Sequence, residues 1–412
     1  MLLKRTMRWL LFLAFALPAC AQMVVPLGPD QAISRAMQSH QLLASGESRV
    51  EAAQGAHQQA AFRPNPRLYL QNENTRFGSA SHPFRFAQET DNFVYVSQVI
   101  EAPGKRSSRL ALGDELIRRR QAELDLLRAT IAHNVALAYW SAVGAERARD
   151  VLHESLRNFE QIVQYHRDRV REGALAEVDL IRIELEREQI AVQAQNAEQE
   201  AIRLRLQLFR EMGEAEVPDT LLSGDLFDIQ PILPPSPEEA LTNRRDLQLA
   251  RQVIQHAKAG TQLEQRNARP DPEVLLGYKR STGYNTMLAG VQIALPFRDR
   301  NQGAIAAARA ETRAAEFDFR AAEESARNEI TAAQSTYQQK LRLVTDTLPR
   351  MRSHATETVQ IARAVYREGG SDLLRFLDAE RAALQTELLF VQSLTDYHRA
   401  LVNLQAATGM LP

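Results

Sequence analysis

The strongest constraint on the fold is an internal duplication, because the same signals occur twice, in the same order, in the 412-residue chain. Arg63-Pro64-Asn65-Pro66 recurs as Arg269-Pro270-Asp271-Pro272, and Arg171-Glu172-Gly173 recurs as Arg367-Glu368-Gly369. Each half carries a helix pattern, a proline pair, two strand-like runs, a very long helix pattern, a glycine break and a shorter helix pattern. The sequence therefore predicts a tandem duplication.

This duplication sets the expected domain organisation. The first repeat is predicted to span residues 22–213 and the second to span residues 238–412. Residues 214–237 contain five prolines, which favour irregular structure, so we expect this segment to link the two repeats.

Helix periodicity dominates both repeats. Apolar residues recur every three or four positions over 106–170 and again over 303–367, and Pro349 is expected to kink the second run. At 1.5 Å per residue the first run spans about 98 Å, which is too long for one compact core. The coiled-coil seams must therefore pack against copies of the chain or partner helices. Shorter helix patterns cover 29–62, 177–212, 238–267 and 372–408.

Four strand-like runs interrupt the helices, at 66–77, 92–102, 271–281 and 285–296. Each has about the 9 to 11 residues that a tilted strand needs to cross a bilayer. Four strands cannot close a barrel, and lipid does not tolerate open sheet edges, so membrane strands would require several chains. A small soluble sheet that caps a helical bundle is the alternative.

The first 21 residues indicate export. A positively charged start is followed by a short apolar run from Trp9 to Leu17, and Ala19-Cys20-Ala21 provides small residues for cleavage. The sequence before Cys20 also resembles a lipobox, in which Cys20 would be acylated. Residues 1–21 are thus predicted to be a signal peptide, with lipidation at Cys20 and simple cleavage after Ala21 both open.

Composition argues against several classes of protein. The 50 basic residues are balanced by 51 acidic ones, whereas proteins that bind nucleic acid are usually basic. Cys20 is the single cysteine, and the nine histidines contain no pair at helical spacing for a metal. No catalytic constellation, metal site or cofactor is predicted, and the chain is not expected to be an enzyme.

Three motifs carry a resemblance to a known family. They are Gln98-x-Ile100-x-x-Pro103-Gly104-Lys105-Arg106, then Leu295-Pro296-Phe297 with Arg300-Asn301-Gln302-Gly303, and finally Tyr366-Arg367-Glu368-Gly369 followed by Phe376-Leu377-Asp378-Ala379-Glu380-Arg381. Because of these motifs, the mature chain resembles the TolC-type outer-membrane efflux channels. The first two motifs are most similar to the outer-membrane subunits of cobalt, zinc, cadmium or copper efflux systems.

The resemblance implies a mainly α fold with a small membrane β part. Long coiled-coil helices would form an α-helical barrel through the periplasm, and four strands per chain would complete a 12-stranded β-barrel shared by a homotrimer in the outer membrane of a Gram-negative bacterium. It implies three further partners: outer-membrane lipid, a periplasmic adaptor (membrane fusion protein) and an inner-membrane RND pump.

The implied function is passive export in a tripartite RND system, with heavy-metal cations as the expected cargo. A drug or organic-compound channel of the same family is the alternative. A periplasmic coiled-coil adaptor or scaffold is an alternative of another class, although an adaptor normally has one hairpin rather than two.

The resemblance also places adaptor-contact tips at two turns. These comprise Arg171, Glu172 and Gly173 in the first repeat and Arg367, Glu368, Gly369, Gly370 and Ser371 in the second. Glycines are also typical of the points where a long helix stops and reverses, so a purely structural role is the alternative for them.

Four residues are assigned to a gate by the same resemblance. Asp378 matches an inward-facing acidic residue that narrows the closed tip, or is an ordinary solvated residue near a helix N-terminus. Asp179 matches an acidic residue that forms a salt bridge with an arginine of the second tip in the family. Ser371 replaces that arginine in this sequence, and our hypothesis is that Arg375 takes over its role. Tyr366 matches a residue that hydrogen-bonds across helices, or it simply packs in a seam.

Overall fold

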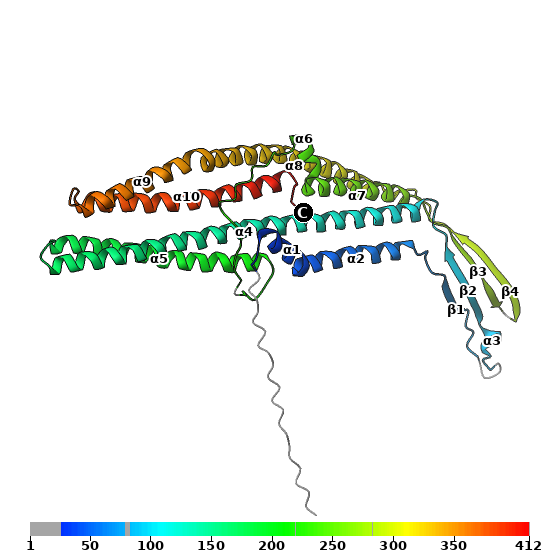
Figure 1. The fold of residues 1–412 in the computed structure, drawn as a ribbon. Coiled ribbons are helices and arrows are strands. Elements are labelled where there is room, and N and C mark those ends of the chain that lie inside the picture. Colours follow the sequence, from blue (N-terminus) through cyan, green and yellow to red (C-terminus); the bar gives the residue numbers. More distant parts are fainter. Residues whose placement is uncertain (1–25, 79–82, 219, 282, 412) are drawn as a thin grey trace, which may run out of the picture.

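The computed structural model describes residues 26–78, 83–218, 220–281 and 283–411. The expected signal peptide, with Cys20, lies outside these ranges. The described chain is a long rod of helices with a β-sheet at one end and two helix turns at the other (Figure 1). No helix among the described residues is both long and apolar enough to cross a membrane.

The two segments predicted to be repeats contain the predicted types of element. The first comprises α1 (Pro29–Ser39), α2 (Gln41–Ala61), β1 (Arg67–Glu73), the short α3 (Phe86–Glu89), β2 (Asp91–Val99), α4 (Lys105–Arg171) and α5 (Glu177–Glu211). The second comprises α6 (Pro237–Asn243), α7 (Arg245–Asn267), β3 (Glu273–Ser281), β4 (Tyr284–Gln292), α8 (Gln302–Arg342), the π-helix η1 (Leu343–Thr347), α9 (Leu348–Arg367) and α10 (Leu373–Ala407). A mainly helical chain with four strands is thus confirmed.

The helices expected at 29–62 and 238–267 are each broken, and the prediction of continuous helices there was wrong. The breaks fall at His40 and Arg244. Gly213 and Gly409 follow the ends of α5 and α10 and have left-handed φ angles of 78° and 69°. Both glycines lie against these breaks. A Cβ on Gly213 would lie 2.9 Å from the His40 ring, and one on Gly409 would lie 2.7 Å from the backbone of Asn243. Each broken helix therefore bends where a neighbouring helix ends.

Pro349 does not end the helix around it. The five-residue π-helix η1 lies directly before α9, and Pro349 is the second residue of α9. Proline lacks an amide hydrogen and clashes with the preceding turn, and the wider π turn accommodates both defects. The chain thus stays helical from α8 through α9.

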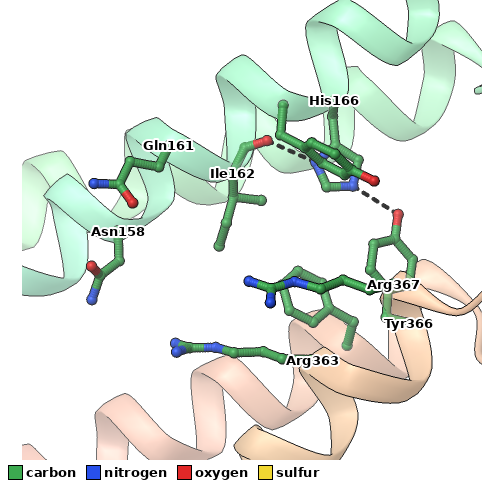
Figure 2. A pocket seen from close by; sticks show the side chains of 9 residues that line it. Asn158, Gln161, Ile162, His166, Arg363, Tyr366 and Arg367 are labelled. Carbon is green, nitrogen blue, oxygen red and sulfur yellow. Dashed lines mark hydrogen bonds between the residues drawn. The ribbon is translucent and has the colours of Figure 1, made fainter.

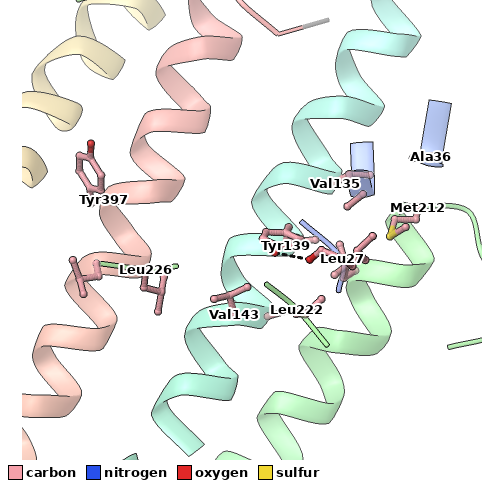
Figure 3. Packing of buried hydrophobic residues seen from close by; sticks show 14 of the residues in the cluster. Leu27, Ala36, Val135, Tyr139, Val143, Met212, Leu222, Leu226 and Tyr397 are labelled. Carbon is pink, nitrogen blue, oxygen red and sulfur yellow. Dashed lines mark hydrogen bonds between the residues drawn. The ribbon is translucent and has the colours of Figure 1, made fainter. Parts of the chain in front are cut away.

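The main hydrophobic core combines apolar residues of the linker with residues from helices of both predicted repeats, and Figure 3 shows part of it. Leu222 of the linker pairs with Leu27, whose carbonyl oxygen accepts a 2.8 Å hydrogen bond from the Tyr139 hydroxyl of α4. On the second repeat, the Leu226 carbonyl lies 3.0 Å from Nε2 of His398 in α10. The linker therefore joins the two hairpins through apolar packing and backbone hydrogen bonds.

The four strands form one antiparallel sheet in the order β1-β2-β3-β4. Their register aligns a row of apolar side chains across one face, since Leu68 lies opposite Val96, and Val96 lies opposite Leu276. All residues of this apolar face are exposed: Leu68, Leu70, Val94, Val96, Val274, Leu276, Tyr278, Met287, Ala289 and Val291. A sheet that capped a soluble bundle would bury such a face against helices, and this sheet projects away from them (Figure 1).

Candidate functional site

The end of the rod opposite the sheet consists of two turns with the same hydrogen bonds. Gly173 and Gly369 have φ angles of 72° and 77°. The next amides, of Ala174 and Gly370, both donate 2.9 Å hydrogen bonds to carbonyls five residues back. This arrangement terminates a helix with a left-handed residue. The expected adaptor-contact residues lie here, exposed except for the half-buried Ser371: Arg171, Glu172, Gly173, Arg367, Glu368, Gly369, Gly370 and Ser371.

A hydrogen bond joins the two hairpins just above these turns. Nε2 of the buried His166, in α4, lies 2.8 Å from the hydroxyl of Tyr366, in α9. Nδ1 of His166 lies 2.7 Å from the Ile162 carbonyl oxygen, so Nδ1 carries the proton and Nε2 accepts from the Tyr366 hydroxyl. The Tyr366 ring also stacks on Phe376 at 4.8 Å. Tyr366 thus both hydrogen-bonds across helices and packs in a seam.

Burial keeps this pair neutral. It lowers the pKa of His166, and the nearby Arg169 acts in the same direction, while Asp179 and the hydrogen bond to Ile162 oppose it. Burial also raises the pKa of Tyr366. Near neutral pH the two hairpins are therefore joined by an uncharged hydrogen bond.

An ion pair closes each hairpin at equivalent positions of the two repeats. Arg363 of α9 holds Glu380 of α10 with two hydrogen bonds of 2.5 and 2.7 Å. In the first repeat, Arg167 of α4 holds Glu184 of α5 at 2.8 Å. Both pairs have the same sequence separation. Our sequence reasoning missed them, although aligning the two repeats would have revealed the shared Arg–Glu spacing.

A second buried carboxylate connects α5 to α10. Glu186 is buried and is bound by Arg381, whose other nitrogen lies 3.7 Å from Asp378. The Asp378 side chain is 63% exposed in the protomer. Its carboxylate is therefore free to face other charges in an assembly, and its predicted place in an acidic constriction stays a prediction.

The other predicted gate residues lie close to the turns. Asp179 lies in the first turn of α5, and Arg375 lies in the first turn of α10, where its amide donates to Asp372. Within the described ranges no ion pair joins Asp179 to Arg375. The suggested substitution of Arg375 for the family arginine stays a hypothesis, which charge-reversal variants at both positions test.

A cavity of about 500 Å³ opens between α4, α9 and α10 beside this hydrogen bond (Figure 2). Its walls combine aromatic, amide and guanidinium groups from Asn158, Gln161, Ile162, Tyr165, His166, Arg363, Tyr366, Arg367 and Phe376. No group of three or more potential metal ligands occurs in the part of the chain that the structure describes.

Hairpin tips lie at one end of the helical rod, and the apolar-faced sheet lies at the other (Figure 1). Residues 236–410 match the family model described as outer membrane efflux protein. This match agrees, for the second part of the chain, with the family that the sequence motifs suggest.

Individual proteins of known sequence or structure are similar to nearly the whole of this chain. The chain is 25% identical to the cobalt-zinc-cadmium resistance protein CzcC of Cupriavidus metallidurans over 396 residues, which cover 93% of this chain and 90% of CzcC. The fold matches CusC with a TM-score of 0.78 at 16% identity, covering 94% of this chain and 93% of CusC. It also matches the CmeC outer membrane channel of Campylobacter jejuni, with a TM-score of 0.78 at 16% identity, covering 92% and 85% of the two chains.

Proposed function

We propose that this protein is the outer-membrane channel of a tripartite efflux system and acts as a passive conduit. The observation that carries the proposal is the exposed apolar face of the sheet. Ten exposed side chains from four adjacent strands lie on it, and soluble monomers rarely expose a continuous apolar surface of that kind. Lipid is the partner that covers a strand face of this composition and length.

The sheet supports a trimer. β1 and β4 are its edge strands, and within lipid an unpaired edge leaves backbone groups without hydrogen bonds. Closure by further copies removes both edges, and three copies give the 12-stranded β-barrel that the family resemblance implies. The 67 residues of α4 extend about 100 Å, so three such rods would form a helical tunnel deep into the periplasm.

The tips support coupling to partners. They lie at the end of the rod farthest from the sheet and are exposed, so in this proposal they meet a periplasmic adaptor and, through it, an inner-membrane RND pump. The relative named for cobalt, zinc and cadmium resistance makes heavy-metal cations the proposed cargo. These cations pass as substrates, and selection lies upstream in the pump.

A deletion strain tests the function. Loss of the gene should increase sensitivity to cobalt, zinc, cadmium or copper, and the wild-type gene should restore resistance. Increased sensitivity to organic drugs alone would instead identify a drug-efflux channel.

Two matched substitutions test the membrane face. Leu70→Arg places a charge on the apolar face, at a cost of about 2 to 4 kcal/mol near the bilayer centre, and should abolish complementation and membrane insertion. Gln71→Arg alters the next residue, on the opposite face, and should be tolerated. Equal behaviour of the two variants would refute a lipid-facing sheet.

A further inference from the structure

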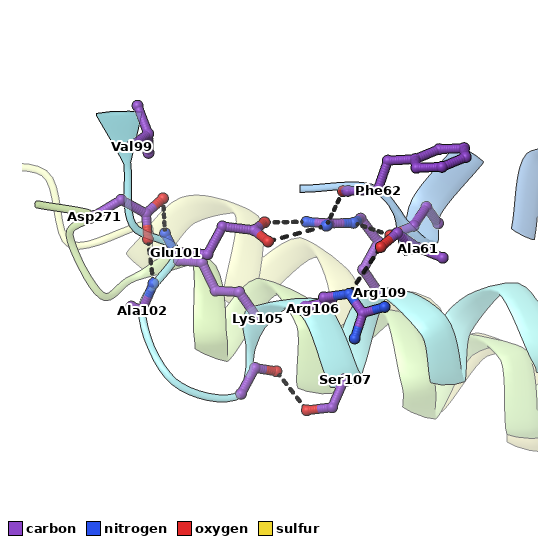
Figure 4. A network of polar contacts seen from close by, with 12 residues as sticks. Ala61, Phe62, Val99, Glu101, Ala102, Lys105, Arg106, Ser107, Arg109 and Asp271 are labelled. Atoms are coloured by element: carbon purple, nitrogen blue, oxygen red, sulfur yellow. Dashed lines mark hydrogen bonds and ion pairs between the residues drawn. The ribbon is translucent and has the colours of Figure 1, made fainter. Parts of the chain in front are cut away.

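In the first predicted repeat, the turn that joins the sheet to the long helix α4 is contacted by a residue of the second predicted repeat. Asp271, from the second Arg-Pro-x-Pro motif, lies against the turn between β2 and α4 (Figure 4). Its carboxylate accepts a 2.7 Å hydrogen bond from the Ala102 amide and lies 2.8 Å from Nζ of Lys105. The amide of Ile100 donates to the carbonyl of Pro272 at 2.8 Å, which continues the β2–β3 pairing into the turn.

The predicted duplication gives an equivalent turn between β4 and α8. Asn301, at its end, donates hydrogen bonds to Glu264 of α7, but the apolar side chains at its start lie open among the described residues. Ile100-Glu101-Ala102-Pro103-Gly104-Lys105 aligns with Ile293-Ala294-Leu295-Pro296-Phe297-Arg298, between β4 and α8. Ala102 and Lys105 are 8% and 9% exposed, whereas Leu295 and Phe297 are 64% and 78% exposed. Two large apolar side chains are thus open where the first repeat is closed.

The residue equivalent to Asp271 is also uncovered. It is Asn65, in the first Arg-Pro-x-Pro motif, and it is exposed. Asn65 precedes β1, whereas the open turn follows β4, at the other edge of the same sheet. Asn65 therefore cannot reach the open turn of its own chain, but it could reach the turn of a second copy.

We propose that Asn65 of one copy lies under the β4–α8 turn of the next copy, as Asp271 lies under the β2–α4 turn of its own chain. The amide oxygen of Asn65 accepts from the Leu295 amide. Arg298 follows Leu295 by three residues, as Lys105 follows Ala102, although α8 begins only at Gln302. The interface between copies then has a neutral acceptor where the junction within the chain has an ion pair. This inference rests on the proposed trimer and specifies which residues join its members.

The strand register agrees with this arrangement. β2 pairs with β3 so that Val99 lies opposite Glu273. The same displacement pairs Gln292 of β4 with Arg67 of the next copy and Val291 with its Leu68. Val291 and Leu68 both belong to the apolar face, so the pairing continues that face across the interface. A shift of one residue would place apolar side chains on the polar face.

Disulfide cross-linking tests the register. Arg67→Cys combined with Gln292→Cys should give covalent dimers and trimers under oxidising, non-reducing conditions. Arg67→Cys with Val291→Cys, one residue out of register, should give few or none. The pair Val99→Cys with Glu273→Cys should cross-link only within a protomer. If the shifted pair cross-linked preferentially, or if no cross-link formed between copies in material of trimer mass, this inference would be overturned while the proposed function would stand. Monomeric protein in detergent would overturn the proposed function, and this inference with it.

Dissociation of the trimer tests the contact at Asn65. Asn65→Asp should raise the dissociation temperature, since a carboxylate would pair with Arg298, and adding Arg298→Gln should remove the gain. Asn65→Leu should lower that temperature. Asp271→Asn, the matched change inside the chain, should weaken the protomer and leave dissociation unchanged. An Asn65→Asp effect that persists with Arg298→Gln, or no effect of either Asn65 variant, would refute the contact.

Discussion

The Nε2 atom of His166 lies 2.8 Å from the hydroxyl of Tyr366, although 200 residues separate them in the chain. His166 belongs to the hairpin of the first repeat and Tyr366 to that of the second. Any movement that separates the two tips must break this hydrogen bond, so it holds the hairpins together in the structure described here.

Tyr366→Phe should loosen the tip while keeping the stacking on Phe376. The buried Nε2 of His166 would lose its donor, which costs about 1 kcal/mol for a neutral hydrogen bond. Hydrogen exchange of peptides covering the turns should become faster, and channels in planar bilayers should leak more. Tyr165→Phe is the matched control, since that ring lies beside the same cavity. Equal effects of the two variants would argue against the hydrogen bond as the cause.

The tip should lose stability as the pH falls below about 6.5, the ordinary pKa of histidine. The pKa of His166 is lowered by burial in the folded tip, so an opened tip binds the proton more readily. The folded state is thus fully favoured above pH 6.5 and weakens towards the lower folded pKa. Tip exchange, corrected for intrinsic rates, should rise between pH 7.5 and 5. A His166→Gln variant with the same pH response would exclude this residue as the source.

The sequence predicted the long elements better than their breaks and contacts. Apolar periodicity and alternation were enough for α4, the four strands and the glycine turns, because these patterns are local. The break at His40 has no proline or glycine to mark it and is set by the end of another helix at Gly213. The partners of Glu186 and His166 likewise come from distant helices, which only tertiary structure brings near.

Asp378→Asn should lower the preference of the channel for cations. In a trimer three exposed carboxylates at the tip attract cations, as charged rings do in other channels. The reversal potential under a salt gradient measures the preference directly. Asp168→Asn removes another exposed tip carboxylate, one that pairs with Arg171, and serves as the control. An unchanged reversal potential for Asp378→Asn would leave Asp378 as a solvated helix residue.

The two hairpin ion pairs should differ in strength. The Arg363–Glu380 side chains are 40% and 6% exposed, whereas those of Arg167–Glu184 are 47% and 40% exposed. Exposed pairs contribute about 0 to 1 kcal/mol, while removing one partner from a more buried pair leaves a costly uncompensated charge. Double-mutant cycles with alanine and glutamine, read from urea unfolding in detergent, should give a larger coupling energy for Arg363–Glu380. Equal coupling energies would mean that solvent screens both pairs alike.

Gly144→Ala should destabilise the contact between α4 and α10. A Cβ at position 144 would clash with Oγ1 of Thr395 and lie 2.7 Å from its Cγ2, and the Thr395 hydroxyl is fixed by a 2.9 Å hydrogen bond to the Val391 carbonyl. Overpacking of this kind costs about 1 to 3 kcal/mol, which should lower the urea midpoint.

Gly260→Ala is the control, because its nearest heavy atom, in Leu112, lies 4.0 Å away. There alanine should stabilise α7 by about 1 kcal/mol through helix propensity alone. Adding Thr395→Ala to Gly144→Ala removes the two crowded atoms and should restore part of the lost stability; no recovery would mean that the helix backbones, rather than Thr395, limit the approach.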